Sequence, residues 1–190
     1  MRLLIDSSSV IVLARVNALS ALHTVYGSVG LIPSVYEEVV IQGQQKGFAD
    51  ATIVAQAVED GWFSQVMLSE EDKRFAATLM KKTAGISHTD AETLACARSR
   101  KLTLLIEDRR ARNVARTEDI PYITIQVFPL YGVLERTLSA SQGDNLLTRI
   151  GRAMNTDLAV VEALRAAVRE IDRSRRKESS PCRHNQLLNS

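Results

Sequence analysis

Short apolar runs alternate with longer amphipathic stretches along the first two thirds of the chain. Continuous apolar runs of this length are typical of parallel strands that are buried on both faces of a sheet. Because these runs alternate with helical stretches, the pattern predicts an α/β fold with a central parallel sheet. The five predicted strands lie at residues 3–5, 29–32, 63–67, 103–106 and 122–125.

The segments between the apolar runs have the spacing of helices. Residues 9–25 predict two short helices that are broken near Asn17. Pro33 and Ser34 begin the next helix, with Ser34 as its N-cap and Glu37 in the capping-box position. Further helices are predicted at residues 48–60, 70–82, 89–101, 109–118, 129–139 and 143–154.

The last part of the chain is predicted to be helical, without a further strand after residue 128. An apolar stripe repeats there every three or four residues, which indicates one face of a helix that ends near Arg173. Such a face either docks on the rest of the chain or forms a dimer or partner surface. The stripe consists of Leu158, Val161, Leu164, Val168 and Ile171.

The length of 190 residues fits one domain with an extension. We therefore predict an α/β domain at residues 1–140, a helical extension at residues 141–174 and a basic, disordered tail at residues 175–190. The net charge is +2, but five basic residues and one acid follow from Arg173 onward. That tail fits a polyanionic or acidic partner, or a solvated end that keeps the protein soluble.

Cysteine content and hydropathy favour a cytoplasmic protein. Two cysteines, Cys96 and Cys182, are too few for a disulfide framework and fit a reducing compartment. Asp6 and Arg15 interrupt the apolar start, which argues against a signal peptide. No apolar run is long enough to span a membrane, so we expect no membrane partner.

Acidic residues follow several predicted strands or open the helices beside them. In an open parallel sheet, ligands bind beyond the carboxyl ends of the strands. Four segments that are far apart in sequence can therefore direct carboxylates toward one place. These acids are Asp6, Glu37, Glu38, Asp90, Glu92, Glu107 and Asp108.

Each acid also has an ordinary structural explanation. Asp90, Glu92 and Asp108 can stabilise helix N-termini by capping and by the helix dipole, and Glu38 can be a solvated helix residue. Asp6 is the hardest to explain in this way, because the serines after it could cap the next helix equally well. A bare carboxylate beside a core is costly unless it is hydrogen-bonded, paired or bound to a cation.

A set of carboxylates without cysteine or histidine suits a hard cation. Mg²⁺ and Mn²⁺ prefer oxygen ligands. One or two such ions can neutralise phosphate charge and activate water for phosphodiester hydrolysis. We therefore interpret the set as a metal site in which Asp6 is a ligand.

Four segments resemble the PIN-domain nucleases. LLIDSSSVIVLARV is similar to the first strand of that family with its first acid, which falls on Asp6. GLIPSVYEEVV is similar to the segment of the second acid, at Glu38, and HTDAETLACARSR to the segment of the third, at Asp90. LTLLIEDRRARNVA resembles the fourth-acid turn and aligns best at Asp108. The resemblance covers residues 1–135 and is strongest to the uncharacterised, VapC-toxin-like PIN proteins of bacteria and archaea.

This resemblance implies a three-layer α/β/α sandwich and an endoribonuclease that hydrolyses single-stranded RNA with Mg²⁺ or Mn²⁺. Family members are often homodimers and often the toxin of a toxin–antitoxin pair. The resemblance implies Asp6, Glu38, Asp90 and Asp108 as catalytic metal ligands. A related subfamily has a further acid where Glu92 stands. Because the fourth turn reads Glu-Asp instead of Asp-Asp, either Glu107 or Asp108 can be the ligand there.

Further residues near these acids fit the same chemistry. Ser8 can hydrogen-bond an Asp6 oxygen or a water on the metal, or it can cap the next helix. Arg109, Arg110 and Arg112 follow the fourth acid and can bind RNA phosphates through their guanidinium groups, or pair with nearby acids.

Other functions remain possible at this stage. The main alternative is a catalytically inactive PIN-like module that binds RNA or a protein. A receiver-type phosphoacceptor domain is disfavoured, because Leu68 and Ser69, and no aspartate, follow the third strand. A haloacid-dehalogenase-type phosphatase needs a second aspartate where Ser8 stands. In a toxin–antitoxin pair, we expect the antitoxin to place an arginine among the acids.

Overall fold

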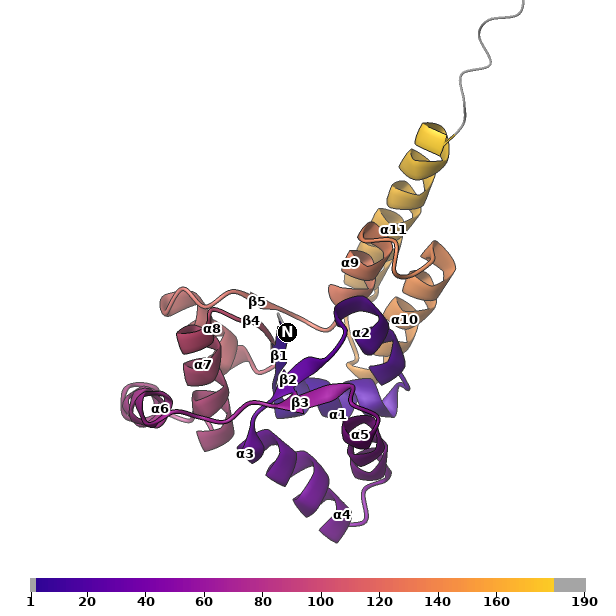
Figure 1. Cartoon of the computed structure of the whole chain (residues 1–190). Coiled ribbons are helices and arrows are strands. Elements are labelled where there is room, and N and C mark those ends of the chain that lie inside the picture. Colours follow the sequence, from indigo (N-terminus) through magenta and orange to yellow (C-terminus); the bar gives the residue numbers. More distant parts are fainter. Residues whose placement is uncertain (1–2, 180–190) are drawn as a thin grey trace, which may run out of the picture.

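A five-stranded, all-parallel sheet with the order β3-β2-β1-β4-β5 forms the centre of the molecule (Figure 1). It is seen in a computed structural model that describes residues 3–179. All five predicted strands are confirmed, although four of them end one or two residues earlier than predicted. The strands are β1 (Leu3–Ile5), β2 (Val29–Leu31), β3 (Phe63–Gln65), β4 (Thr103–Leu105) and β5 (Tyr122–Ile123).

Helices flank this sheet on both sides, which confirms the α/β/α sandwich (Figure 1). The helices α6 (Glu70–Lys82), α7 (His88–Arg100) and α8 (Arg109–Thr117) gather on one side. On the other side lie α1 (Ser7–Arg15), α2 (Leu19–Tyr26) and α5 (Ala49–Glu59).

The central strands are buried because helices cover both faces of the sheet. Leu4 in β1 pairs with Gly30 in β2 and with Leu104 in β4. Neither Leu4 nor Leu104 has solvent-exposed surface. Apolar runs without alternation are therefore the right signal for these strands.

The helical segment after β2 begins differently from the prediction. Pro33 is the first residue of α3 (Pro33–Tyr36), and Ile32 is its N-cap. Ser34 is therefore not the cap, and its hydroxyl is buried without a hydrogen-bond partner. Proline is well suited to the first helical position, because it has no N–H to satisfy and its φ is already helical.

The same segment then widens into a π-helical turn, η1 (Glu37–Ile41), before α4 (Gln42–Gln45) completes it. Short π-helical turns inside α-helices are frequent at functional sites. This turn contains Glu38, one of the predicted acids.

The two N-terminal helices break where the sequence predicts. Asn17 takes a left-handed conformation with φ of 51° between α1 and α2. Among residues 3–179, no single helix is long and apolar enough to cross a membrane. The bent pair of α1 and α2, at 118° to each other, meets the length and composition criteria. Its apolar residues Val10, Leu13 and Leu22 are buried in the protein core.

The C-terminal helices form a separate group beside α2 (Figure 1). They are α9 (Phe128–Leu134), α10 (Ala140–Ala153) and α11 (Leu158–Ser179). Val161 and Val168 of the predicted stripe are buried. A Cβ atom at Gly151 would lie 2.7 Å from Val161, so α10 and α11 are in close contact there. Most of the stripe docks on the chain, whereas Leu158 is 73% exposed.

Three predicted helix ends in this region are wrong. The helix predicted to continue to residue 139 ends at Leu134, because Ser139 and Gln142 form a capping box that begins α10 three residues before its predicted start. The last helix does not end near Arg173 but continues to Ser179. The predicted disordered tail is therefore helical at residues 175–179. Its remainder, with Cys182, lies outside the described residues.

Candidate active site

The predicted acids lie at the carboxyl ends of the central strands. The strand order changes direction between β1 and β4, since β2 and β3 lie on one side of β1 while β4 and β5 lie on the other. A crevice at such a switch point is the usual ligand site of an open α/β sheet. Asp6 follows β1 directly, and Glu107 and Asp108 come shortly after β4.

Asp6 is a buried carboxylate that is held by hydrogen bonds. It is only 1% exposed. As the N-cap of α1, its Oδ1 accepts a hydrogen bond from the Ser9 amide at 2.7 Å. Its Oδ2 accepts from the Ser8 hydroxyl at 2.9 Å and from the Glu107 amide at 3.0 Å. Burial raises the pKa of Asp6, and these hydrogen bonds offset part of that effect.

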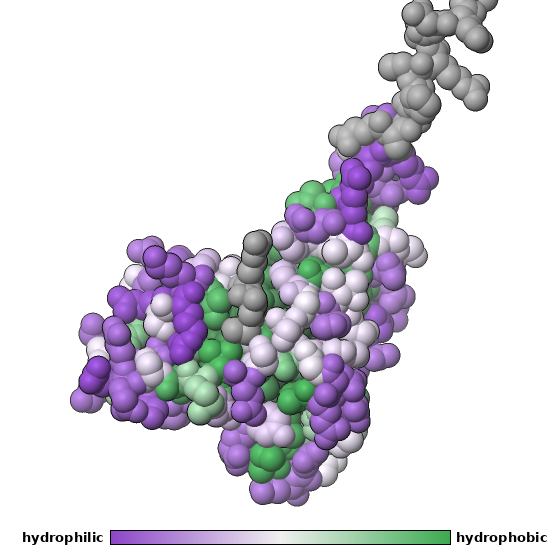
Figure 2. Space-filling view, viewed as in Figure 1, coloured by the Kyte–Doolittle hydropathy of each residue, from purple (hydrophilic) through white to green (hydrophobic). Residues whose placement is uncertain are grey.

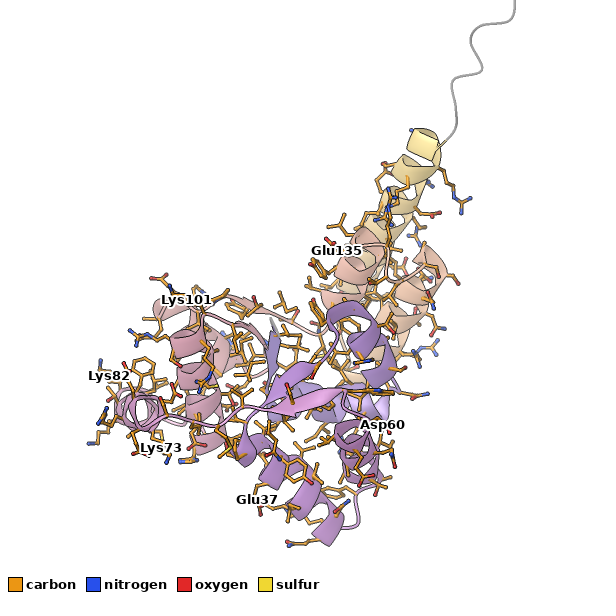
Figure 3. The ribbon with its side chains drawn as sticks, in the orientation of Figure 1. Glu37, Asp60, Lys73, Lys82, Lys101 and Glu135 are labelled. Atoms are coloured by element: carbon orange, nitrogen blue, oxygen red, sulfur yellow. The ribbon has the colours of Figure 1, made fainter. Side chains whose placement is uncertain are left out.

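Glu38 is tied to the same end of the sheet through Ser7. The Ser7 hydroxyl donates a hydrogen bond to Glu38 Oε2 at 2.8 Å, and this bond joins the start of α1 to η1. The neighbouring Glu37 is exposed on the outer side of the segment between α3 and α4 (Figure 3). Of these two adjacent acids, Glu38 is the one that contacts the residues around Asp6.

Asp90 and Asp108 lie at the N-termini of two neighbouring helices. Asp90 is in the first turn of α7, where its Oδ2 accepts a hydrogen bond from the Ser87 hydroxyl at 2.7 Å. Asp108 is the N-cap of α8 and accepts from the Ala111 amide at 2.8 Å. Both acids therefore have the helix-stabilising contacts that their positions allow.

The electrostatics of Asp90 show that three other acids lie close enough to act on it. The pKa of Asp90 is raised to about 6, chiefly by burial and further by the negative charges of Asp6, Asp108 and Glu38. The Ser87 hydrogen bond opposes this rise. Within residues 3–179, none of the four forms an ion pair with a lysine, arginine or histidine. We refer to Asp6, Glu38, Asp90 and Asp108 as the acid quartet.

Glu92 does not join the acid quartet. Positions two apart on an α-helix point to nearly opposite sides, so Glu92 faces away from Asp90. Its side chain is buried and lies 3.5 Å from His88 Nε2. It acts electrostatically on Lys73 of α6.

Glu107 is close to Asp6, but its side chain binds other parts of the protein. Its Oε1 accepts a hydrogen bond from the Ile125 amide at 2.5 Å, and its Oε2 lies 3.6 Å from Arg112 Nη1. The pKa of Glu107 is raised to about 7, mainly by burial; the Ile125 hydrogen bond and Arg112 lower it, and Asp6 raises it. These contacts favour Asp108 as the fourth acid.

The three predicted phosphate-binding arginines occupy different environments. Arg112 donates to the Glu107 carbonyl oxygen at 2.5 Å, and Arg110 donates to the Gly85 carbonyl oxygen at 2.8 Å. Arg109 is exposed and has no hydrogen bond or ion pair within residues 3–179. RNA contact by this group stays a prediction, and Arg109 is the arginine most available for it.

The chemistry of the acid quartet fits a hard divalent cation. In the described part of the chain, no group of three or more Asp, Glu, His or Cys side chains is close enough to hold a metal ion. The donor set nevertheless consists of carboxylate oxygens, which Mg²⁺ and Mn²⁺ prefer. Burial raises the pKa of both Asp6 and Asp90, and within the described part of the chain neither carboxylate forms an ion pair that would oppose this rise.

Two serines that position the acid quartet were not predicted. Ser87 stands three residues before Asp90, and this Ser-x-x-Asp spacing is a capping signal that the sequence does contain. Ser7 contacts Glu38 across 31 positions. No local pattern predicts that contact, because it depends on how η1 packs against α1.

Comparison with known protein families agrees with this architecture. The model of the DUF3368 family, a PIN domain, matches residues 2–128. No protein of the curated collection matches the chain. The matched region contains all five strands and the complete acid quartet. The chain therefore belongs to the PIN-domain family, which has a nuclease-type fold and whose members are generally nucleases.

Proposed function

We propose that this protein is an endoribonuclease that hydrolyses phosphodiester bonds of single-stranded RNA with Mg²⁺ or Mn²⁺. The observation that carries the proposal is the gathering of four carboxylates from distant segments, where Asp6 is 1% exposed and the charges of Asp6, Asp108 and Glu38 act on Asp90. Gathering like charges at a strand edge costs stability. A bound cation would offset that cost, and the PIN-domain family supplies the matching activity.

The acid quartet would hold the cation in this proposal. When bound, Mg²⁺ or Mn²⁺ activates water and stabilises negative charge on phosphate oxygens. The protein itself fixes the ligands before the ion arrives. Hydroxyl groups of Ser7 and Ser8 orient Glu38 and Asp6, and the Glu107 amide fixes the second Asp6 oxygen. Arg109 is exposed one residue after Asp108, where it can contact a substrate phosphate.

The biological setting that we propose is a cytoplasmic toxin–antitoxin pair in which this chain is the toxin and forms a homodimer. The support is the resemblance of the four acid-bearing segments to VapC-like PIN proteins. An antitoxin that places an arginine among four unpaired carboxylates would gain charge-assisted hydrogen bonds and displace the cation. A gene for a small partner protein next to the gene for this chain would support this setting.

A PIN-like module that binds RNA or a protein without cleaving is the second candidate. It is favoured by the spacing of the acids, since no three of them in the described residues are close enough to share an ion. In that case the acid quartet would bind a basic segment of a partner. The two candidates differ in whether products form, and the fold is the same for both.

Cleavage of a labelled pool of single-stranded RNA tests the proposal. The reactions contain wild type or Asp6→Asn with Mg²⁺, with Mn²⁺ or with EDTA. We expect products from wild type with either metal, none with EDTA, and little or none from Asp6→Asn. The matched control is Asp144→Asn, which removes an acid from the C-terminal helices and should cleave like wild type.

Two results would contradict the proposal. An Asp6→Asn protein as active as wild type would show that the acid quartet is not catalytic. If wild type makes no products under any condition but retains RNA in a binding assay, the non-cleaving module becomes the better description.

A further inference from the structure

A groove lies between the C-terminal end of α6 and the exposed face of α8. Its volume is about 380 Å³, within the range of sites for small molecules and cofactors. Leu79 and Val114 are buried beneath it, with exposed fractions of 2% and 8%, and provide an apolar floor. Lys82, Arg110, Asn113 and Thr117 line the polar parts.

The groove runs along α8, the helix that Asp108 of the acid quartet caps. The helix begins directly after Asp108, and the groove residues Arg110, Asn113, Val114 and Thr117 follow at intervals of three, one and three residues. That spacing places them on one face of the helix. At the near end, Arg110 donates to the carbonyl oxygen of Gly85, in the loop that leads to Asp90. Arg110 thus joins the start of α8 to the loop before α7, the two helices that begin beside Asp108 and at His88.

The groove presents hydrogen-bond donors. Lys82 and Arg110 contribute positive charge, and the Arg110 guanidinium has N–H groups beyond the one that Gly85 uses. Asn113 accepts from Arg116 through its amide oxygen, so its amide NH₂ group can bind a ligand. The groove also has one acid, Glu118, at its far end. Its Oε2 atom lies 3.9 Å from Arg98 Nε, so its charge is paired. Figure 2 shows hydrophilic residues over the surface that α6 and α7 form on this side.

RNA needs such a surface near the acid quartet. The quartet repels phosphates, so a strand must be held by positive charge next to the cut site. A donor-lined groove with an apolar floor accepts one nucleotide, with the face of the base on Leu79 and Val114 and the phosphate toward Lys82 and Arg110. Phosphate contacts fix the register of the strand, and the Asn113 amide can bind acceptor groups on the base.

The geometry points to this groove as a subsite for a nucleotide of the RNA strand that flanks the scissile phosphate, an inference that rests on the proposed function. Lys82 and Arg110 bind the phosphate, and Asn113 contributes to base preference. The site accounts for substrate positioning, which the acid quartet alone does not provide.

Matched lysine variants test the subsite. Lys82, which is labelled in Figure 3, lies at the end of α6. The adjacent Lys81 is exposed like Lys82, but of the two only Lys82 lines the groove. Lys82→Gln and Lys81→Gln therefore change the net charge equally. Binding of a fluorescein-labelled single-stranded RNA is measured by anisotropy in EDTA over a range of salt concentrations. We expect Lys82→Gln to weaken binding and to reduce the salt slope by about 0.7, the value for one phosphate contact on a single strand.

A second variant tests base preference. Asn113→Asp keeps an acceptor for Arg116 but removes the amide donors and adds a negative charge facing the groove. We expect weaker RNA binding and an altered preference among homopolymers of the four bases. Thermal unfolding of each variant shows whether it is folded.

The outcomes separate the subsite from the nuclease activity. Equal salt slopes for Lys82→Gln and Lys81→Gln, or no RNA binding by wild type, would overturn the subsite. If wild type binds RNA in this groove-dependent way yet cleaves none with Mg²⁺ or Mn²⁺, the subsite stands and the proposed hydrolysis fails. If cleavage depends on Asp6 but the two lysine variants change RNA binding equally, the proposed hydrolysis stands and the subsite fails.

Discussion

The acid quartet and the ion-pair network between α10 and α11 both gather carboxylates, but only the network provides cations for them. In the network, the Asp144 oxygens bind Arg165 at 2.7 and 2.8 Å, and Glu162 binds the same arginine at 2.6 Å. The hydrogen bond from Arg165 lowers the pKa of Asp144. Burial and neighbouring carboxylates instead raise the pKa of Asp90 to about 6.

This difference distinguishes acids that stabilise the fold through ion pairs from acids that we propose bind a cation. The network joins two helices and is complete within the chain. Within residues 3–179 the acid quartet forms no ion pair, and one of its members is 1% exposed. Residues that lower stability in this way are characteristic of functional sites. Variants in the two regions should therefore have opposite effects on activity and stability.

The largest expected effect comes from Asp90→Asn. Cleavage of RNA with Mn²⁺ should fall by about 100-fold or more, the scale seen when a group that stabilises transition-state charge is removed. In metal-free buffer at pH 8, the melting temperature should rise, because the change removes repulsion by Asp6, Asp108 and Glu38. The asparagine oxygen can still accept the hydrogen bond from Ser87. A melting temperature that falls while activity persists would make Asp90 a structural residue.

A pH series sharpens the comparison next. The pKa of Asp90 is about 6 in the folded state, against an ordinary value of 3.8, so the folded protein binds more protons between these pH values. The free energy of unfolding should therefore fall as pH rises from about 4 to 6. Glu107, with a pKa of about 7, extends this loss toward neutral pH. Urea titrations in EDTA measure the free energy of unfolding at each pH. Its decline with rising pH should be smaller for Asp90→Asn than for wild type. An equal decline in both proteins would contradict the raised pKa of Asp90.

Asp144→Asn is expected to lower stability and to leave cleavage unchanged, which is the opposite of the expectation for Asp90→Asn and a smaller effect. Both partners of the Asp144–Arg165 pair are about 30% exposed. Loss of one such pair costs about 1 kcal/mol. Urea unfolding should show this loss, while RNA cleavage stays at the wild-type rate. A cleavage defect without loss of stability would indicate that α10 and α11 take part in catalysis.

The smallest effect is expected for Glu107→Gln. The glutamine oxygen can still accept from the Ile125 amide, so the change removes the charge and the Arg112 interaction. We expect the cleavage rate to change by less than about fivefold, since a partly exposed ion pair contributes at most about 1 kcal/mol. Asp108→Asn is the companion variant and should lose far more activity. If Glu107→Gln loses as much, Glu107 is the fourth ligand.

The sheet was predictable from the sequence because it depends on local patterns, whereas the four acids of the quartet were singled out by the resemblance of their segments to PIN-domain nucleases. Buried parallel strands are continuous apolar runs, and strand-end acids converge wherever such strands are neighbours. A local rule could also have corrected one detail, since Pro33 suits the first helical position better than Ser34 suits the cap. Metal binding by Glu92 stays a prediction, although its carboxylate lies 3.5 Å from His88 Nε2.

Other features could not be predicted, because they depend on contacts between distant segments. The hydrogen bond between Ser7 and Glu38 spans 31 positions, and the one between Glu107 and Ile125 spans 18. Arg110 and Arg112 were predicted to bind RNA from their place after the acid turn. Their contacts with Gly85 and Glu107 become visible only when the α6–α7 loop and the end of β4 are placed in space.

Isothermal titration calorimetry at pH 6, in which Mn²⁺ is added to wild type or to Asp90→Asn, tests the central claim most directly. The account predicts that wild type binds Mn²⁺ saturably and releases protons, because the pKa of Asp90 lies near this pH and the ligand must be deprotonated. Asp90→Asn should bind far more weakly and release fewer protons. Absence of binding to wild type, or equal binding and proton release by the two proteins, would contradict the claim that the acid quartet is a cation site.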